Sequence, residues 1–206
     1  MSGRIALGLW AVATLLALFL GYRLLVFALP ESGHETYPAM KTSEILAGPD
    51  GHAYQYVAAP NISWEAARQA ASRRSWQGRQ GHLATIESAT EYRFVIDRLF
   101  AGPPPDVTYL GGRQTAPGEW RWIAGPAAAD DGGKGRLFWT GDERGHAPDG
   151  LYSNWMATAF QHGGKWDVNK VCCLTLFSYG LPQFSTSLGN GDPEEGVSGY
   201  LVEFGG

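Results

Sequence analysis

The sequence contains little of what stabilises or activates many small extracellular domains. Its two cysteines, Cys172 and Cys173, are neighbours, so disulfides that cross the fold are excluded and the core must be stabilised mainly by apolar burial. Charged residues make up 17% of the chain, the formal net charge is −4, and no long run of Lys and Arg occurs. Proteins that bind phosphate backbones present a basic face, so we expect no nucleic-acid partner.

The histidines are also sparse and scattered. None is spaced from another or from a cysteine as metal ligands or catalytic triads are, so we expect no enzyme. The five positions are His34, His52, His82, His146 and His162.

The first 29 residues are strongly apolar. The stretch from Ile5 to Tyr22 is almost unbroken, and apolar residues resume after Arg23. About 18 to 20 such residues span a bilayer as a helix, so we predict a transmembrane signal-anchor at 1–29. A cleaved signal peptide, with Val26-Phe27-Ala28 before the cut, is the alternative. Either interpretation places the remainder outside the cytoplasm, in the periplasm or extracellular space.

The remainder divides into a polar linker at 30–50 and one globular domain at 51–206. Ser63 can cap a helix that runs to about Arg74, and Ser88-Ala-Thr-Glu91 is a capping box that opens a second helix. Strand-like segments and loops follow these two helices. This order predicts an α+β domain.

The segment 109–125 is the strongest strand signal in the chain. Gly111 and Gly112 allow a close backbone approach, and Trp120 and Trp122 alternate with Arg121. Such alternation predicts a strand with one buried and one solvated face. The residues expected in the structural core are Trp64, Leu110, Gly111, Trp120, Trp122, Trp139 and Tyr200.

Eight short motifs occur in an order that resembles the C-type lectin-like domain in its bacterial form. They are Trp64-Glu-Ala, Gly81-His-Leu-Ala-Thr-Ile86, Glu91 with Phe94, Tyr109-Leu-Gly-Gly112, Gly118-Glu-Trp-Arg-Trp122, Phe138-Trp-Thr-Gly141, Tyr152-Ser-Asn-Trp155 and Gly199-Tyr-Leu-Val-Glu-Phe204. The resemblance implies two helices flanking a small, mostly antiparallel sheet. It also implies that the first and last strands pair, and that a long loop region emerges from the sheet.

The family's calcium-dependent sugar site is altered in this sequence. Such members carry Glu-Pro-Asn or Gln-Pro-Asp shortly after the Asn-Trp, and Trp-Asn-Asp before the last strand. Here Asn154-Trp155 is followed by Met156-Ala-Thr-Ala-Phe160, and the second position reads Phe184-Ser-Thr186. We expect no cofactor, because carboxylates that would ligate calcium are missing. The alternative is calcium-dependent carbohydrate binding through a rebuilt site, with candidate ligands Asp142, Asp149, Asp167 and Asp192.

The cysteines depart from the family as well. One of Cys172 and Cys173 matches its third conserved cysteine, but the partner expected near 184–192 is absent. We expect buried free thiols, with a vicinal disulfide as the alternative. A related fold supports formylglycine-generating enzymes, which use reactive thiols. This enzymatic role is a minor alternative, since an apolar strand disfavours a thiolate.

The leading hypothesis is a membrane-anchored, calcium-independent binding module that recognises a protein partner or a glycan through the loop region 142–192. A variant of it is an accessory subunit of a membrane complex. Aromatic side chains there, including Tyr152, can stack on sugars or anchor a protein, or they can be buried in a loop core. The candidate ligand-binding residues are Asn154, Trp155, Phe160, Trp166, Asp167 and Tyr179.

Overall fold

The computed structural model describes residues 41–100, 107–142, 144–159, 172–178, 182–187 and 196–205. The predicted signal-anchor and most of the predicted linker lie outside these ranges. Among the described residues, no helix has both the length and the apolar character needed to cross a bilayer.

Short helices and strands alternate along the first half of the described chain. The strands are β1 (Leu46–Ala47), β2 (Ala53–Ala58), β3 (Ser75–Trp76) and β4 (Arg79–Leu83). The helix α2 (Trp64–Ser72) follows β2, and α3 (Ala89–Phe94) continues into the π-helix η1 (Val95–Leu99).

Strands dominate the second half. They are β5 (Val107–Ala116), β6 (Glu119–Trp122), β7 (Arg136–Thr140), β8 (Cys173–Phe177), β9 (Gln183–Ser187) and β10 (Gly199–Phe204). Three short helical segments, η2 (Pro126–Ala129), α4 (Asp130–Gly133) and η3 (Pro148–Gly150), lie in the connections.

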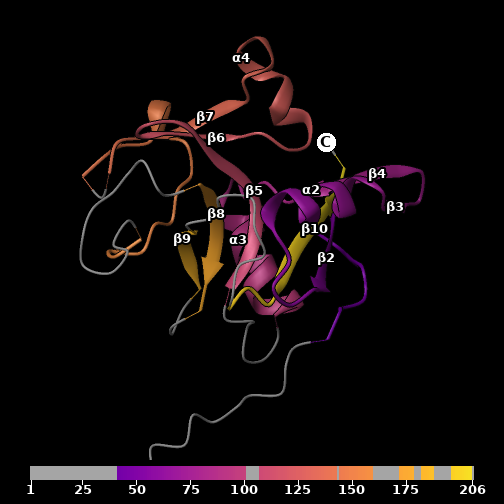
Figure 1. Ribbon diagram of the computed structural model, residues 1–206. Helices are drawn as coiled ribbons and strands as arrows, with labels where there is room; N and C mark the ends of the chain where they lie inside the picture. The colour runs from indigo at the N-terminus through magenta and orange to yellow at the C-terminus, as the bar shows by residue number, and fades with distance from the viewer. Residues whose placement is uncertain are drawn as a thin grey trace, which may run out of the picture. The chain divides into compact units, whose positions relative to one another are not determined.

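The strands form a sheet whose main path is β1-β2-β10-β5-β6-β7 (Figure 1). β8 pairs with β5 and β9 with β8, while β4 pairs with the end of β10 and forms a hairpin with β3. The pairing of β10 with β5 is parallel, and the other strand pairs named here are antiparallel. β10 therefore lies between β2 on one side and first β5, then β4, on the other.

β10 is buried on both faces because a helix covers each one. Tyr200, Val202 and Phe204 belong to the apolar cluster that contains Trp64 and Ala67 of α2. The neighbouring side chain Leu201 belongs instead to the cluster that contains residues of η1. This is the α+β arrangement that the resemblance implies, with helices on both faces and the first and last long strands paired.

Both predicted helix starts are present. The Ser63 side chain accepts a hydrogen bond from the Ala66 amide, and Ser88 Oγ accepts one from the Glu91 amide at 3.1 Å. The capping box is completed differently from expectation, because Glu91 Oε2 accepts from the amide of Glu87 at 2.8 Å. The Glu91 carboxylate is thereby turned toward the sheet.

The glycines and tryptophans of the segment 109–125 lie in the core. A side chain on Gly111 would place its Cβ 2.7 Å from the carbonyl oxygen of Leu83, so the close approach requires glycine here. Trp120 and Trp122 are fully buried, but the predicted solvated face is not found. Arg121 is only 7% exposed, because its guanidinium donates to Gly135 O at 2.8 Å and pairs with Asp131 at 3.0 Å.

Six of the seven residues expected in the core are buried. The seventh, Trp139, is half-buried, and its neighbour Phe138 takes the inward position at 1% exposure. The structured part also begins earlier than the boundary at 51, because Leu46–Ala47 forms β1 against β2 within the segment assigned to the linker.

Candidate functional site

Five large aromatic side chains pack together where β6, β7 and β9 meet the loop after η3. We call this group the aromatic cluster; it consists of Trp120, Trp122, Phe138, Trp155 and Phe184. Trp122 stacks on Phe138 with ring centroids 4.4 Å apart, and Trp155 packs edge-on against Trp120 at 5.2 Å. Of the five, Trp155 alone is half-exposed, so it forms the outer surface of the cluster.

The aromatic cluster occupies the place where the resemblance puts the calcium triplets. Phe184 and the Asn154-Trp155 segment are joined by backbone hydrogen bonds, from Phe184 N to Asn154 O at 2.8 Å and from Met156 N to Phe184 O at 3.0 Å. The Thr186 hydroxyl donates to Ala159 O at 2.7 Å. Both positions are therefore closed by contacts within the protein, and their described residues supply no carboxylate.

The acidic candidates in the described loops do not converge. Asp142 Oδ1 accepts from the Arg144 amide at 2.9 Å, and its Oδ2 lies 3.5 Å from the Arg144 guanidinium. Asp149 sits in η3 with a positive φ of 51°. Among the described residues, neither belongs to a group with ligand atoms close enough to share a metal ion.

The predicted ligand-binding residues are only partly described. Asn154, Trp155 and Tyr152 are half-buried, and Tyr152 packs against Phe184 with ring centroids 6.0 Å apart. For Tyr152 and Trp155, packing against a loop core is therefore observed. The other candidates lie outside the described residues; they are Phe160, Trp166, Asp167, Tyr179 and Asp192.

The prediction of free thiols was wrong. Cys172 and Cys173 form a vicinal disulfide at the start of β8, with Cα atoms 3.7 Å apart. Adjacent residues hold their sulfurs within bonding reach of each other, so no distant partner is needed. Neither sulfur is left as a thiol for the chemistry of formylglycine-generating enzymes.

A second group of side chains, all of them polar, lies where β2 begins and β10 ends; Tyr54, Thr85, Glu91 and Glu203 are buried in it. We call it the strand-end network; it consists of Asp50, His52, Tyr54, Thr85, Glu91 and Glu203. The sequence analysis did not identify it as a site. A signal was present, because Asp50, His52 and Tyr54 alternate and so share one face of an extended chain.

Tyr54 joins two carboxylates in this network. Its hydroxyl donates to Asp50 Oδ2 at 2.7 Å and lies 3.2 Å from Glu91 Oε1. A hydroxyl has one hydrogen, so a second hydrogen bond requires Glu91 to carry a proton and donate to Tyr54. Burial, reinforced by the charge of Glu203, raises the pKa of Glu91 to about 7, which agrees with this proton count.

Glu203 joins β10 to β2 and β4. It is 1% exposed, and its Oε2 accepts from the amide of Thr85 at 2.9 Å and from the Thr85 hydroxyl at 3.1 Å. Its Oε1 lies 2.6 Å from His52 Nδ1, and this contact raises the pKa of His52. Burial raises the pKa of Asp50, but hydrogen bonds from Tyr54 and the His52 amide outweigh it, so the net shift is downward.

Asp50, His52 and Glu91 are the described residues whose arrangement is closest to that of metal ligands, with one ligand atom from each lying within 4.8 Å of the others. Their oxygens already accept hydrogen bonds from Tyr54, His52 and Glu87. The same is true of Glu87, which receives a charged hydrogen bond from Arg136 at 2.6 Å. The carboxylates of Asp50, Glu87 and Glu91 are therefore engaged by groups of the protein itself.

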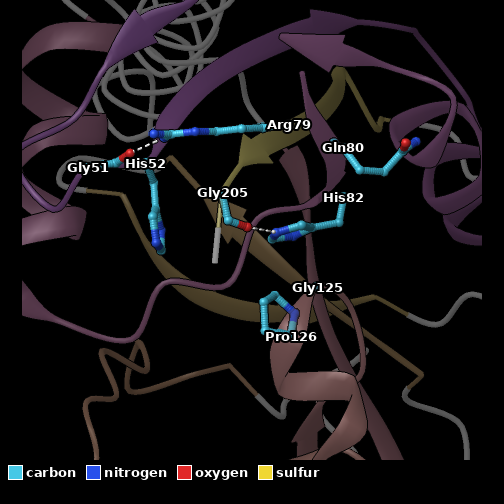
Figure 2. Close-up of a pocket in the computed structure, with 9 residues that line it drawn as sticks. Gly51, His52, Arg79, Gln80, His82, Gly125, Pro126 and Gly205 are labelled. Carbon is cyan, nitrogen blue, oxygen red and sulfur yellow. Dashed lines mark hydrogen bonds between the residues drawn. The ribbon is translucent and has the colours of Figure 1, made fainter. Parts of the chain in front are cut away.

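A cavity of about 640 Å³ opens next to the strand-end network (Figure 2). His82 spans one wall, with Nε2 3.2 Å from Gly205 O and Nδ1 3.0 Å from Leu83 O. Arg79 reaches across the rim and donates to Gly51 O. The lining residues are Gly51, His52, Arg79, Gln80, Gly81, His82, Gly125, Pro126 and Gly205.

Comparison with known proteins gives one similar sequence and several similar structures. No protein-family model matches the sequence. A segment of halomucin from Haloquadratum walsbyi is 30% identical over 168 residues. The match covers 79% of this chain but 2% of halomucin, so the chain spans a small fraction of that protein's length.

Similar solved structures include C-type lectin domains. The lectin CEL-I from Cucumaria echinata superposes with a TM-score of 0.49 at 14% identity, over 82% of this chain and 98% of that one. The carbohydrate-recognition domain of the human scavenger receptor C-type lectin gives 0.44 at 16% identity, over 81% and 98% of the two chains.

Proposed function

We propose that this chain carries a C-type lectin-like binding module that recognises a glycan or a protein partner without calcium in its loop region. It has no enzymatic role in this proposal. The recognition surface is the loop region 142–192, in which Trp155 presents a half-exposed indole packed against the aromatic cluster. A supported aromatic ring is a common anchor for a sugar face or a protein side chain.

The observation that carries the proposal is the closed bridge between Trp155 and Phe184. Calcium takes six to eight oxygen ligands, mostly from carboxylates and carbonyls. At the two positions in question, Phe184 is fully buried, and its backbone is paired with Asn154 and Met156. A ligand at this surface therefore meets an aromatic ring and backbone edges instead of a bound cation.

The experiment is a binding screen of the full chain against a glycan array, with calcium and with chelator. We expect any glycan signal to be the same in both conditions, and Trp155→Ala to reduce it about tenfold while Trp76→Ala, a half-buried tryptophan on β3, leaves it unchanged. A pull-down from detergent-solubilised native membranes tests the protein-partner form of the proposal. A stoichiometric membrane partner supports an accessory subunit, and glycan binding alone supports a lectin.

Calcium-dependent carbohydrate binding is the outcome that would contradict the proposal. It requires that chelator abolish glycan binding and that calorimetry detect calcium at micromolar strength. The strand-end network also contains carboxylates, so a heat of calcium binding could come from either region. A variant must therefore show which region binds the ion. Loss of that heat in an Asp142→Asn, Asp149→Asn double variant would assign it to the loops.

The proposal includes a membrane anchor at 1–29 that leaves the domain outside the cytoplasm. The support for it is the apolar run in the sequence. Carbonate extraction of native membranes, followed by protease treatment of intact cells, tests it. Release of the chain by carbonate, or protection of the domain from protease, would refute the anchor or the orientation.

A further inference from the structure

The cavity beside the strand-end network lies in the most basic part of an acidic chain. Between residues 66 and 86 the sequence has four arginines and no Asp or Glu. Arg68 is paired with Glu65 at 2.6 Å. Within the part of the chain that the structure describes, Arg73, Arg74 and Arg79 form no ion pair. Positive charge without a protein counter-charge is therefore available here.

Arg79 brings one of these charges to the cavity. Its Nη1 donates to Gly51 O, which holds the guanidinium across the rim (Figure 2). A guanidinium has five N–H donors in a planar fork that matches a carboxylate or sulfate. Among the described residues, the contact with Gly51 uses one of them. The remaining donors are held in place and have no carboxylate partner within the described ranges.

The acidic side chains near the cavity are engaged within the protein. Glu203 is 1% exposed and contacts Thr85 and His52. Asp50 accepts from the Tyr54 hydroxyl and from the His52 amide. Neither carboxylate lines the cavity. A ligand inside therefore meets the Arg79 guanidinium and two imidazoles, and does not meet the acids directly.

Glycines keep the cavity open. A Cβ on Gly125 would lie 2.5 Å from the His82 ring, and one on Gly205 would lie 2.8 Å from the His52 ring. Both glycines have positive φ, at 60° and 144°, which disfavours replacement by other residues. The volume of about 640 Å³ is within the range of pockets that hold small organic ligands.

We infer that this cavity binds the oxyanion group, carboxylate or sulfate, of a small organic ligand, with Arg79 as the residue that contacts the anion. The site is built from β4, the start of η2 and the residues next to the ends of β2 and β10, and it does not depend on the loop-region function proposed above. An acidic sugar is the probe that fits both the volume and the charge.

The test is a calorimetric titration of the full 206-residue chain at constant ionic strength and pH 7. The probes are glucuronate, inorganic sulfate and glucose, the last being the neutral counterpart of glucuronate. We expect glucuronate and sulfate to bind and glucose to bind at least about tenfold more weakly. Arg79→Gln should weaken glucuronate by about tenfold or more, because a charge-assisted hydrogen-bond pair is lost. Arg79→Lys keeps the charge without the fork and should fall between the two.

The matched control is Arg98→Gln, which removes the same charge from an exposed position on η1 and should leave the affinity unchanged. Circular dichroism of each variant confirms that it is folded. Equal affinity for glucose and glucuronate, or unchanged affinity in Arg79→Gln, would overturn the inference. So would binding of sulfate alone, since that would restrict the site to an inorganic ion, or no binding of either anion at millimolar concentration.

Discussion

The aromatic cluster and the strand-end network are two largely buried groups of side chains on one sheet, and they are stabilised in opposite ways. The aromatic cluster is assembled from β6, β7, β9 and the loop after η3 through stacked and edge-on ring contacts. The strand-end network joins β2, β4, α3 and β10 through carboxylates, a phenol and an imidazole. The hydrophobic effect is non-directional, whereas each hydrogen bond in the network requires a particular distance and angle.

The difference determines how each region responds to change. Removing an aromatic ring leaves a cavity, with a cost that grows with the volume lost. Removing one polar partner leaves another buried group without its hydrogen bond or counter-charge. The aromatic cluster should therefore be sensitive to size and insensitive to pH, and the strand-end network should show the reverse.

The largest effect is expected from Phe184→Ala in the aromatic cluster. The ring is fully buried between Trp122, Phe138 and Trp155, so its loss should reduce the free energy of unfolding by about 3–5 kcal/mol. Denaturant titration followed by tryptophan fluorescence measures it. The control Phe184→Leu retains most of the volume and should cost roughly 1 kcal/mol. A loss in Phe184→Ala as small as in the control would show that the cluster is not closely packed.

A smaller effect is expected from Glu203→Gln in the strand-end network. The change removes the charge that faces His52 and weakens the bonds from Thr85, so we expect a loss of about 2–3 kcal/mol near pH 6. Glu65→Gln is the matched control, because Glu65 also pairs with a basic side chain but is exposed, and it should cost less than about 1 kcal/mol. Equal losses in the two variants would remove the distinction between buried and exposed charge.

The smallest effect is expected from Glu91→Gln in the strand-end network, and its size should depend on pH. The pKa of Glu91 is about 7 in the folded protein and is near its ordinary value of 4.5 when unfolded. The folded state then binds more protons between these values, so stability falls as the pH rises through that range. Glu91→Gln imitates the protonated form. It should match the parent near pH 5 and be about 1–2 kcal/mol more stable at pH 8.

The pKa of His52 is also raised, mainly by Glu203, so its contribution to stability is likewise lost as the pH rises; Glu203 is retained in both proteins. Urea titrations at a series of pH values give the difference directly. A difference between parent and Glu91→Gln that stays constant from pH 5 to pH 8 would contradict the proton count at Tyr54. Phe184→Ala should show the same cost at every pH.

The aromatic cluster could be anticipated in part from the sequence. The alternation of Trp120 and Trp122 and the two glycines before them predicted a buried strand, and both rings are buried. The local pattern could not show that the connection between β6 and β7 covers the face of β6 that carries Arg121. Asp131 and Gly135, which make Arg121 a buried residue, belong to a connection with no regular periodicity.

The strand-end network could not be anticipated in the same way. Thr85 and Glu203 are 118 positions apart, and Tyr54 and Glu91 are 37 apart. Each of these residues has an ordinary local role, such as the helix cap assigned to Glu91. Their convergence is a consequence of β10 lying between β2 and β4, a long-range pairing that no short window contains. The arginines around the cavity were likewise hidden by the net acidic charge of the whole chain.

The register of β2 against β10 has a mechanical consequence. Ala53, the first residue of β2, lies opposite Phe204, the last of β10, so the chain enters and leaves these strands at the same rung. Tension applied through the two flanking segments would pull the pair apart one rung at a time, like a zipper, and would not shear all rungs at once. The contact between His52, just before β2, and Glu203, opposite Tyr54 in the second rung, lies at this end of the pair. A pulling force would have to break this contact as the first rungs of the pair separate.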